Sequence, residues 1–463
     1  MRAIDIQAVI DKVPDYQAFL TLDELDESTK KLAWEYPDVV TVFEAGRSRQ
    51  GHPILGLKIG EGRKNALCFA CPHPNEPIGA MTMEFLSRAL AEDEDLRKSL
   101  DLTWYIIKSI DPDGVRLNEK WFKGPYSITD YTKHFFRPAG YEQVEWTFPI
   151  DYKELGFQTP LPETQALMKI IDEIKPVFMY SLHNTGFGGA YWYLSHDLPE
   201  LYEPLKQSAL KQGVALSLGE PEAPYVTEFS PAIYQTLSVT KYYDYLEELL
   251  GSAPNIHFGA SSGDYVQRIA DCVTLVTELP YFMDPRVQDQ SEGEISRKEA
   301  LLKNVEIGER YYSKLESLLG GVRVLIRVEN PFVKLVEEIL SVKDEILESK
   351  KNWAISQPQF EEKATVSQIF DNLYASKFFN GLLVGLLLRA CEYEVGRLQS
   401  EASQDTIAIA RLQETWEKAE RWLRNHCEEM EQVLDYSVVP IKQLVRIQAE
   451  CGLLVASYVS KKS

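Results

Sequence analysis

Apolar positions in the first two thirds of the chain follow two alternating patterns. Short apolar runs predict β-strands at residues 39–45, 54–59, 65–70, 102–110, 177–182 and 273–277. Apolar residues spaced as on one helix face predict helices at 79–91 and 162–174. Strands that alternate with helices are typical of an α/β domain, so we expect a mixed β-sheet flanked by helices. Ligands of such sheets bind beyond the carboxyl ends of the strands, where several polar residues of this chain stand.

The pattern changes after residue 294, where long helical segments replace the alternation. The predicted helices cover residues 294–319, 332–349, 366–399, 404–434 and 439–458, and no strand is predicted among the last four. Gly320 and Gly321 end the first of them. The sequence therefore predicts an α/β domain at 1–320 and an all-α C-terminal domain at 321–463. The helical domain could support oligomerisation or partner binding, or simply pack on the first domain.

The charge of the chain narrows its expected partners and location. Its 463 residues include 70 acidic and 49 basic side chains, a net charge of −21. Nucleic acids and anionic membranes reward clustered Lys and Arg, so we expect neither as a partner. The N-terminal residues lack the apolar core of a signal peptide, and no segment reaches the roughly 18 apolar residues of a membrane span. These features predict a cytoplasmic protein. The six cysteines are too sparse for a disulfide framework and predict buried, structural thiols.

Three polar positions follow predicted strands and suit a metal site. His73 and Glu76 form an H-x-x-E pair between a strand and a helix. His183 ends the strand at 177–182 and supplies a third ligand of the His2Glu set that catalytic zinc uses, with the fourth position left for water. Glu278 ends the strand at 273–277, where a carboxylate beside the metal could act as general base. Each position alone is a weak signal.

Taken in order, these positions resemble the M14 zinc carboxypeptidases. The landmarks are the H-x-x-E pair at His73, the Pro-Asp-Gly turn at 112–114, the strand-end His183, and the Thr-Glu-Leu-Pro stretch at 277–280. The resemblance covers roughly residues 30 to 315. It implies an α/β sheet domain, one zinc ion per chain held by His73, Glu76 and His183, Glu278 as general base, and hydrolysis at the C-terminal end of a peptide.

The resemblance also implies residues that contact the substrate. By order along the chain, Arg116 resembles the arginine that stabilises the oxyanion, and Arg137 resembles the one that pairs with the substrate carboxylate. Asn184, in the glycine-rich loop after His183, is predicted to contact substrate. The family's mobile tyrosine has no direct counterpart, and His257, Phe258 or Tyr265 could replace it. The tyrosine-rich segment 242–248 predicts a helix that either walls the cleft or faces solvent.

Three functions remain open from the sequence. The first is a carboxypeptidase acting on small peptides. The second is a deacylase of small N-acyl amino acids, because the segments around His73 and His183 also resemble the aspartoacylase branch of the superfamily. The third is a binding or scaffold protein that retains an inactive site. The segment at 277–280 favours the peptidase, and the intact ligand set argues against the scaffold.

Overall fold

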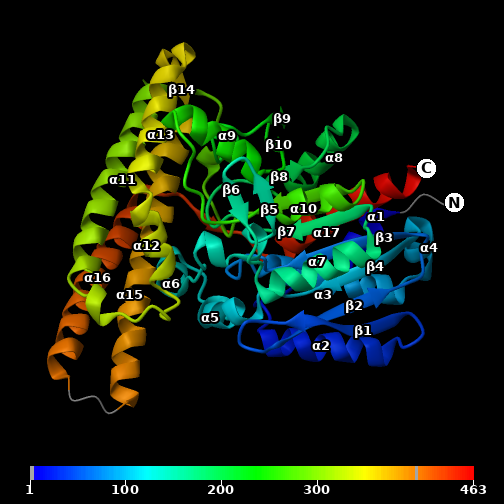
Figure 1. Cartoon of the computed structure of the whole chain (residues 1–463). Helices are drawn as coiled ribbons and strands as arrows, with labels where there is room; N and C mark the ends of the chain where they lie inside the picture. The colour runs from blue at the N-terminus through cyan, green and yellow to red at the C-terminus, as the bar shows by residue number, and fades with distance from the viewer. Residues whose placement is uncertain (1–4, 402–404, 463) are drawn as a thin grey trace.

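A nine-stranded mixed sheet forms the centre of the molecule. The computed structural model describes residues 5–401 and 405–462. The sheet has the strand order β1-β2-β4-β3-β7-β11-β8-β10-β9 (Figure 1). Its strands are β1 Val40–Arg47, β2 Pro53–Ile59, β3 Lys64–Ala70, β4 Leu102–Ile107, β7 Phe178–Leu182, β8 Tyr191–Leu194, β9 Glu228–Ser230, β10 Ile233–Gln235 and β11 Val273–Glu278. The six predicted strands are all present, and β8, β9 and β10 were missed because each has only three or four residues.

The three central strands bring the predicted metal ligands to one edge. β7 pairs in parallel with both β3 and β11, so the carboxyl ends of all three coincide. Their side chains are almost all buried, which explains why they appear in the sequence as continuous apolar runs. His73 follows β3, His183 follows β7, and Glu278 is the last residue of β11.

Helices cover both faces of the sheet. One face packs against α2 Leu22–Glu35, α3 Ile78–Glu92, α8 Pro199–Leu210 and α17 Ile441–Lys461, and the other against α7 Pro162–Ile174, α9 Val239–Leu250 and α10 Ser262–Ile269. Smaller helices at the periphery are α1 Ile6–Ile10, α4 Glu94–Leu100, α5 Pro112–Phe122 and α6 Ile128–His134. Gly79 lets α3 begin close to the sheet, because a Cβ there would lie 2.7 Å from the Leu182 Cβ. This close approach sets the position of Glu76, which precedes the helix.

Long helices form a bundle beside the sheet (Figure 1). They are α11 Arg297–Gly320, α12 Lys334–Ser341, α13 Lys343–Ser356, α14 Val366–Phe370, the π-helical turn Asp371–Ala375, α15 Ser376–Ser400 and α16 Thr406–Val433. The expectation that this region lacks strands was wrong. Short ladders join β13 Glu292–Ser296 to β14 Lys363–Thr365 and β12 Phe282–Met283 to β15 Ser437–Val438. Two- to five-residue strands carry too few alternating positions to be seen in a sequence.

The last helix belongs to the sheet rather than to the bundle. α17 packs against α3, α8, β7 and β11, and its buried residues share one hydrophobic cluster with those strands. The division into domains at residue 320 stays a prediction. The structure adds that the chain returns to the sheet after leaving the bundle.

Two further sequence predictions can be compared with the structure. All six cysteines are buried and unpaired, as predicted. Within the described part of the chain, no helix combines the length and apolar character needed to cross a membrane.

Candidate metal centre

Three donor atoms converge beyond the ends of β3 and β7. The Nδ1 atoms of His73 and His183 lie 3.0 Å apart. The Glu76 carboxylate lies 3.1 Å from the first Nδ1 and 3.0 Å from the second. Among the described residues, these three form the one cluster of His, Cys, Asp and Glu side chains with metal-ligand spacing. All three side chains are buried.

The donor set fits a divalent metal ion. Zinc bonds of about 2.0–2.2 Å place neighbouring tetrahedral donors about 3.3 Å apart, close to the spacing seen here. The Nε2–H of His183 donates to Ser181 Oγ over 2.8 Å, and Ser181 in turn donates to Glu145. These two hydrogen bonds keep the His183 proton on Nε2. The Nδ1 atom of His183 can then present its lone pair to a metal ion.

The protonation preferences of the three residues reflect their burial and mutual charge. Burial and the charge of Arg137 lower the pKa of His73 to about 3. Burial also favours a neutral His183, but the hydrogen bond and charge of Glu76 outweigh it and raise that pKa to about 9. The same histidines lower the pKa of Glu76 below its usual range, against the opposing effect of burial. A metal ion would displace the His183 proton on binding.

The backbone around the ligands is held from several directions. Cys71 has a φ of 56°, a left-handed conformation that turns the chain sharply between β3 and His73. The carbonyl of His183 accepts a hydrogen bond of 2.8 Å from Gln448 on α17. Gln448 also accepts from Thr82 on α3. The C-terminal helix therefore links the two segments that carry the ligands.

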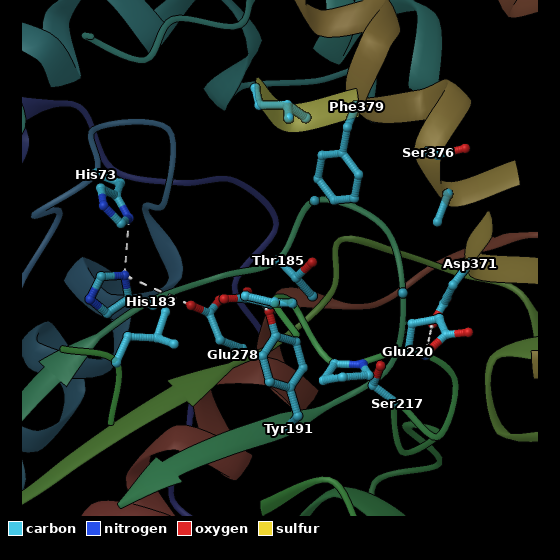
Figure 2. Close-up of a pocket in the computed structure, with 18 of the residues that line it drawn as sticks. His73, His183, Thr185, Tyr191, Ser217, Glu220, Glu278, Asp371, Ser376 and Phe379 are labelled. Carbon is cyan, nitrogen blue, oxygen red and sulfur yellow. Dashed lines mark hydrogen bonds and ion pairs between the residues drawn. The ribbon is translucent and has the colours of Figure 1, made fainter. Parts of the chain in front are cut away.

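Glu278 lies next to the three ligands, as predicted. Its carboxylate is 3.9 Å from His183 Nδ1, and Figure 2 shows it between His183 and Tyr191. Burial raises the pKa of Glu278 well above its ordinary value, and the nearby charge of Glu76 adds to the effect. A buried carboxyl group in this position could accept and release a proton next to a metal ion held by the three residues.

The two predicted arginines have different surroundings. Arg137 donates to Glu76 over 3.2 Å and lines the cavity around the metal centre. Arg116 lies on α5 and pairs with Asp23 at 2.7 Å, with 42% of its side chain exposed. The structure therefore does not bring Arg116 to the centre. The Pro-Asp-Gly segment starts a helix capped by Asp111, and that helix directs Arg116 towards the surface.

Of the remaining residues predicted to contact substrate, one lines the cavity and the others lie outside it. Asn184 is buried and lines the cavity, and its Nδ2 has no hydrogen-bond partner. His257 is exposed, contacts Asn255, and does not line the cavity. Tyr265 also lies outside, bonded to Asp172. The place of the family's mobile tyrosine is thus not filled by either residue.

Comparison with known proteins agrees with this geometry. Residues 25–239 match the model of the family described as zinc carboxypeptidase. Over these residues, somewhat less than half of its length, the chain is similar to the zinc carboxypeptidases. It is similar to zinc carboxypeptidase A 1 of Anopheles gambiae, with 30% identity over 120 residues that are 24% of this chain and 27% of the relative. The corresponding Drosophila melanogaster protein is 30% identical over 111 residues, 22% and 26% of the two chains. The chain thus spans about a quarter of the curated relatives it matches.

Solved structures give weaker similarities. Carboxypeptidase A from Helicoverpa armigera superposes with a TM-score of 0.36 and 17% identity, covering 60% of this chain and 69% of the other. A metallo-carboxypeptidase from Pseudomonas aeruginosa gives 0.35 and 16%, covering 55% and 59%. The family match ends at residue 239, before Glu278 and the helical bundle.

A cavity of about 800 Å³ extends from the candidate metal centre to the helical bundle. Figure 2 shows it running from the two histidines past Glu278 to Glu220 and Asp371. α9 forms part of its wall through Tyr242 and Tyr245, as one of the two interpretations of that segment predicted. The bundle forms another wall, with side chains that include Leu335, Ile339, Glu345, Lys350, Asp371 and Phe379.

Several residues that line the cavity could not be predicted from the sequence. Glu145 is buried beside His183, where burial raises its pKa, yet it follows no predicted strand. Tyr191 and Tyr193 alternate on the unpredicted strand β8. Their alternation with Trp192 was a possible strand signal, but four residues are too few to separate it from a loop.

Proposed function

We propose that this chain is a zinc-dependent carboxypeptidase that hydrolyses a peptide bond at the C-terminal end of a short peptide. The observation that carries the proposal is the convergence of His73 Nδ1, His183 Nδ1 and the Glu76 carboxylate within 3.0–3.2 Å, with Glu278 at 3.9 Å from His183. The family match supports the same chemistry. A bound zinc ion supplies a Lewis acid that polarises a carbonyl and makes water more acidic.

The chain's own residues would carry out the proton and charge transfers. Glu278 takes the proton of the attacking water and passes it to the leaving nitrogen, since its carboxylate is buried next to the ligands. Arg137 is better placed than Arg116 to stabilise the charge that develops on the attacked carbonyl oxygen, because its guanidinium lies 3.2 Å from Glu76. The donor Nδ2 of Asn184 is free to bind a substrate carbonyl.

The size of the cavity favours a peptide over a small acyl amino acid. Its volume of about 800 Å³ is in the upper part of the range of pockets that bind drug-sized ligands. This volume is enough for a peptide of a few residues. The bundle closes one side of it, which limits the length of chain that can enter. A deacylase of small N-acyl amino acids would leave most of this space unused.

Metal content and one conservative variant test the proposal. Purified protein should hold about one zinc ion per chain, and His73→Ala and His183→Ala should each lose it. Glu278→Gln keeps the size and hydrogen-bonding capacity of the side chain but removes the base. It should retain zinc and lose at least about 100-fold in kcat on an N-acyl dipeptide.

Two results would contradict this assignment. Full activity in Glu278→Gln would exclude the residue as the base. Absence of metal from carefully handled protein, or zinc content untouched by both histidine variants, would favour the inactive scaffold instead.

A further inference from the structure

The cavity has far more acidic than basic side chains. Its described lining includes seven carboxylates, those of Glu76, Glu145, Glu220, Glu222, Glu278, Glu345 and Asp371. Among the same described lining residues, the permanent cations are Arg137 and Lys350. A divalent ion at the metal centre would offset two carboxylates, and Arg297, outside the lining, pairs with Glu220. An excess of negative charge remains.

Each lining cation already lies beside a carboxylate other than Glu222, Arg137 beside Glu76 and Lys350 within the influence of Glu220. Arg137 is already paired with Glu76 at 3.2 Å. Lys350 lies on α13 of the bundle and donates a hydrogen bond of 2.9 Å to Asn304. Cationic charge can therefore best be supplied by a molecule that enters the cavity.

Glu222 is the carboxylate whose surroundings suit an organic cation. It is exposed, so solutes can reach it, and no Lys or Arg of the described chain forms a hydrogen bond or ion pair with it. Its two oxygens accept hydrogen bonds from the hydroxyls of Tyr191 and Tyr193, the latter at 2.7 Å. Two neutral donors hold the carboxylate in place without neutralising its charge.

An aromatic group stands next to this carboxylate. The ring centroids of Tyr191, Tyr193 and Tyr234 lie between 5.8 and 6.3 Å from one another. All three tyrosines line the cavity. Ammonium and guanidinium groups are attracted to the faces of such rings, most strongly where a carboxylate completes the site.

The sheet places this aromatic group beside the catalytic centre. Tyr191 is paired directly with Glu278 across β8 and β11, and Tyr193 is paired with Val276 and with Tyr234. Residues paired across strands share a face, so the tyrosines and Glu278 project into the same cavity. Thr274, on the same face of β11, adds a buried cavity-lining hydroxyl without a hydrogen-bond partner. A polar group of a ligand would satisfy it.

We propose that Glu222, Tyr191, Tyr193 and Tyr234 form a subsite that binds a positively charged side chain of the substrate, an ammonium or guanidinium group, next to the scissile bond. The proposal rests on the function proposed above and specifies its substrate class. It predicts selection for lysine or arginine over neutral side chains of the same length.

Matched substrates that differ by one charge test this subsite. The zinc-loaded full chain would be assayed with N-acyl dipeptides that carry lysine or norleucine, placed on either side of the scissile bond. Lysine should be preferred in kcat/KM by about tenfold or more at one of the two positions. Glu222→Gln should reduce that ratio to about twofold or less. Glu154→Gln removes an exposed carboxylate outside the cavity lining and should leave the ratio unchanged.

The outcomes separate the subsite from the proposed reaction. Hydrolysis without a lysine preference at either position, or a preference that survives Glu222→Gln, would overturn the subsite and leave the peptidase proposal intact. If no peptide is hydrolysed, calorimetry with N-acetyl-lysine amide and N-acetyl-norleucine amide decides. Tighter binding of the lysine compound that is lost in Glu222→Gln would support the subsite, and equal binding would refute it.

Discussion

The contact between the last helix and the metal-ligand segments can be tested by replacing Gln448 with methionine. Gln448 is fully buried on α17, donates to the His183 carbonyl at 2.8 Å, and accepts from the Thr82 hydroxyl at 2.9 Å. Methionine has a similar volume, so the substitution leaves little cavity. It removes both side-chain hydrogen bonds and leaves two buried polar groups without partners.

The expected loss follows from those two groups. An unsatisfied buried donor or acceptor costs about 1–3 kcal/mol. The hydrogen bond from Tyr180 to the Gln448 backbone carbonyl is unaffected by the side chain. We therefore expect Gln448→Met to lower the free energy of unfolding by about 2–4 kcal/mol, a large part of the roughly 5–15 kcal/mol typical of a domain.

Urea denaturation of the metal-free protein would measure this loss. Gln443→Met, on the same helix but half-buried and without a side-chain hydrogen bond in the described structure, is the matched control and should change stability by less than about 0.5 kcal/mol. A weaker zinc affinity in Gln448→Met should accompany the loss, since the His183 carbonyl is no longer held. If Gln448→Met lowered the free energy of unfolding by less than about 1 kcal/mol, no more than the control does, α17 would not be an integral part of the ligand-bearing sheet.

Two further predictions concern charges in the cavity. Arg137→Ala should lower kcat/KM by about 100-fold while zinc is retained. Arg116→Ala should keep kcat/KM within about twofold of the wild type. Steady-state assays of both variants would contradict the proposed role of Arg137 if Arg116→Ala lost more activity. Burial raises the pKa of Asp371 to about 7, so the folded state binds more protons than the unfolded chain between about pH 4 and 7, and stability is lost as pH rises through that window. Asp371→Asn should therefore be more stable than the wild type by roughly 4 kcal/mol at pH 8, about 1.4 kcal/mol for each of the three pKa units, and equal to it at pH 4. Urea titrations that show a pH-independent difference would refute this explanation.

The ligands of the metal centre could be predicted because they obey a local rule. β3, β7 and β11 are buried on both faces, so each gives an apolar run that ends where the polar residue begins. Parallel pairing then brings His183 and Glu278 to the same edge as His73. Strand ends and ligand chemistry singled out these positions, and the order of the landmarks along the chain, which resembles that of the zinc carboxypeptidases, combined them into one site.

Arg116 shows where order along the chain fails as a guide. It follows the Pro-Asp-Gly segment at the expected spacing, but Asp111 caps a helix whose first residue is Pro112. The helical turn then fixes the direction of Arg116, towards Asp23 at the surface. Arg137, further along, reaches Glu76 because α6 and the loop after it return the chain to the sheet edge. The spacing of Arg116 and Arg137 along the chain does not determine which of the two arginines lies at the sheet edge.

The walls of the cavity could not be predicted because they come from segments far apart in the chain. Glu222 lies in a loop and meets Tyr191 and Tyr193 only through the folded sheet, while Asp371 and Phe379 reach the cavity from the bundle. The bundle lies outside the residues that match the family. The metal centre and the cavity walls thus have separate origins: the first lies at the ends of three neighbouring strands, and the second combines the loop around Glu222 with side chains of the bundle. Substrate selectivity should therefore respond to changes in the bundle and in the loop around Glu222 while the zinc content stays constant.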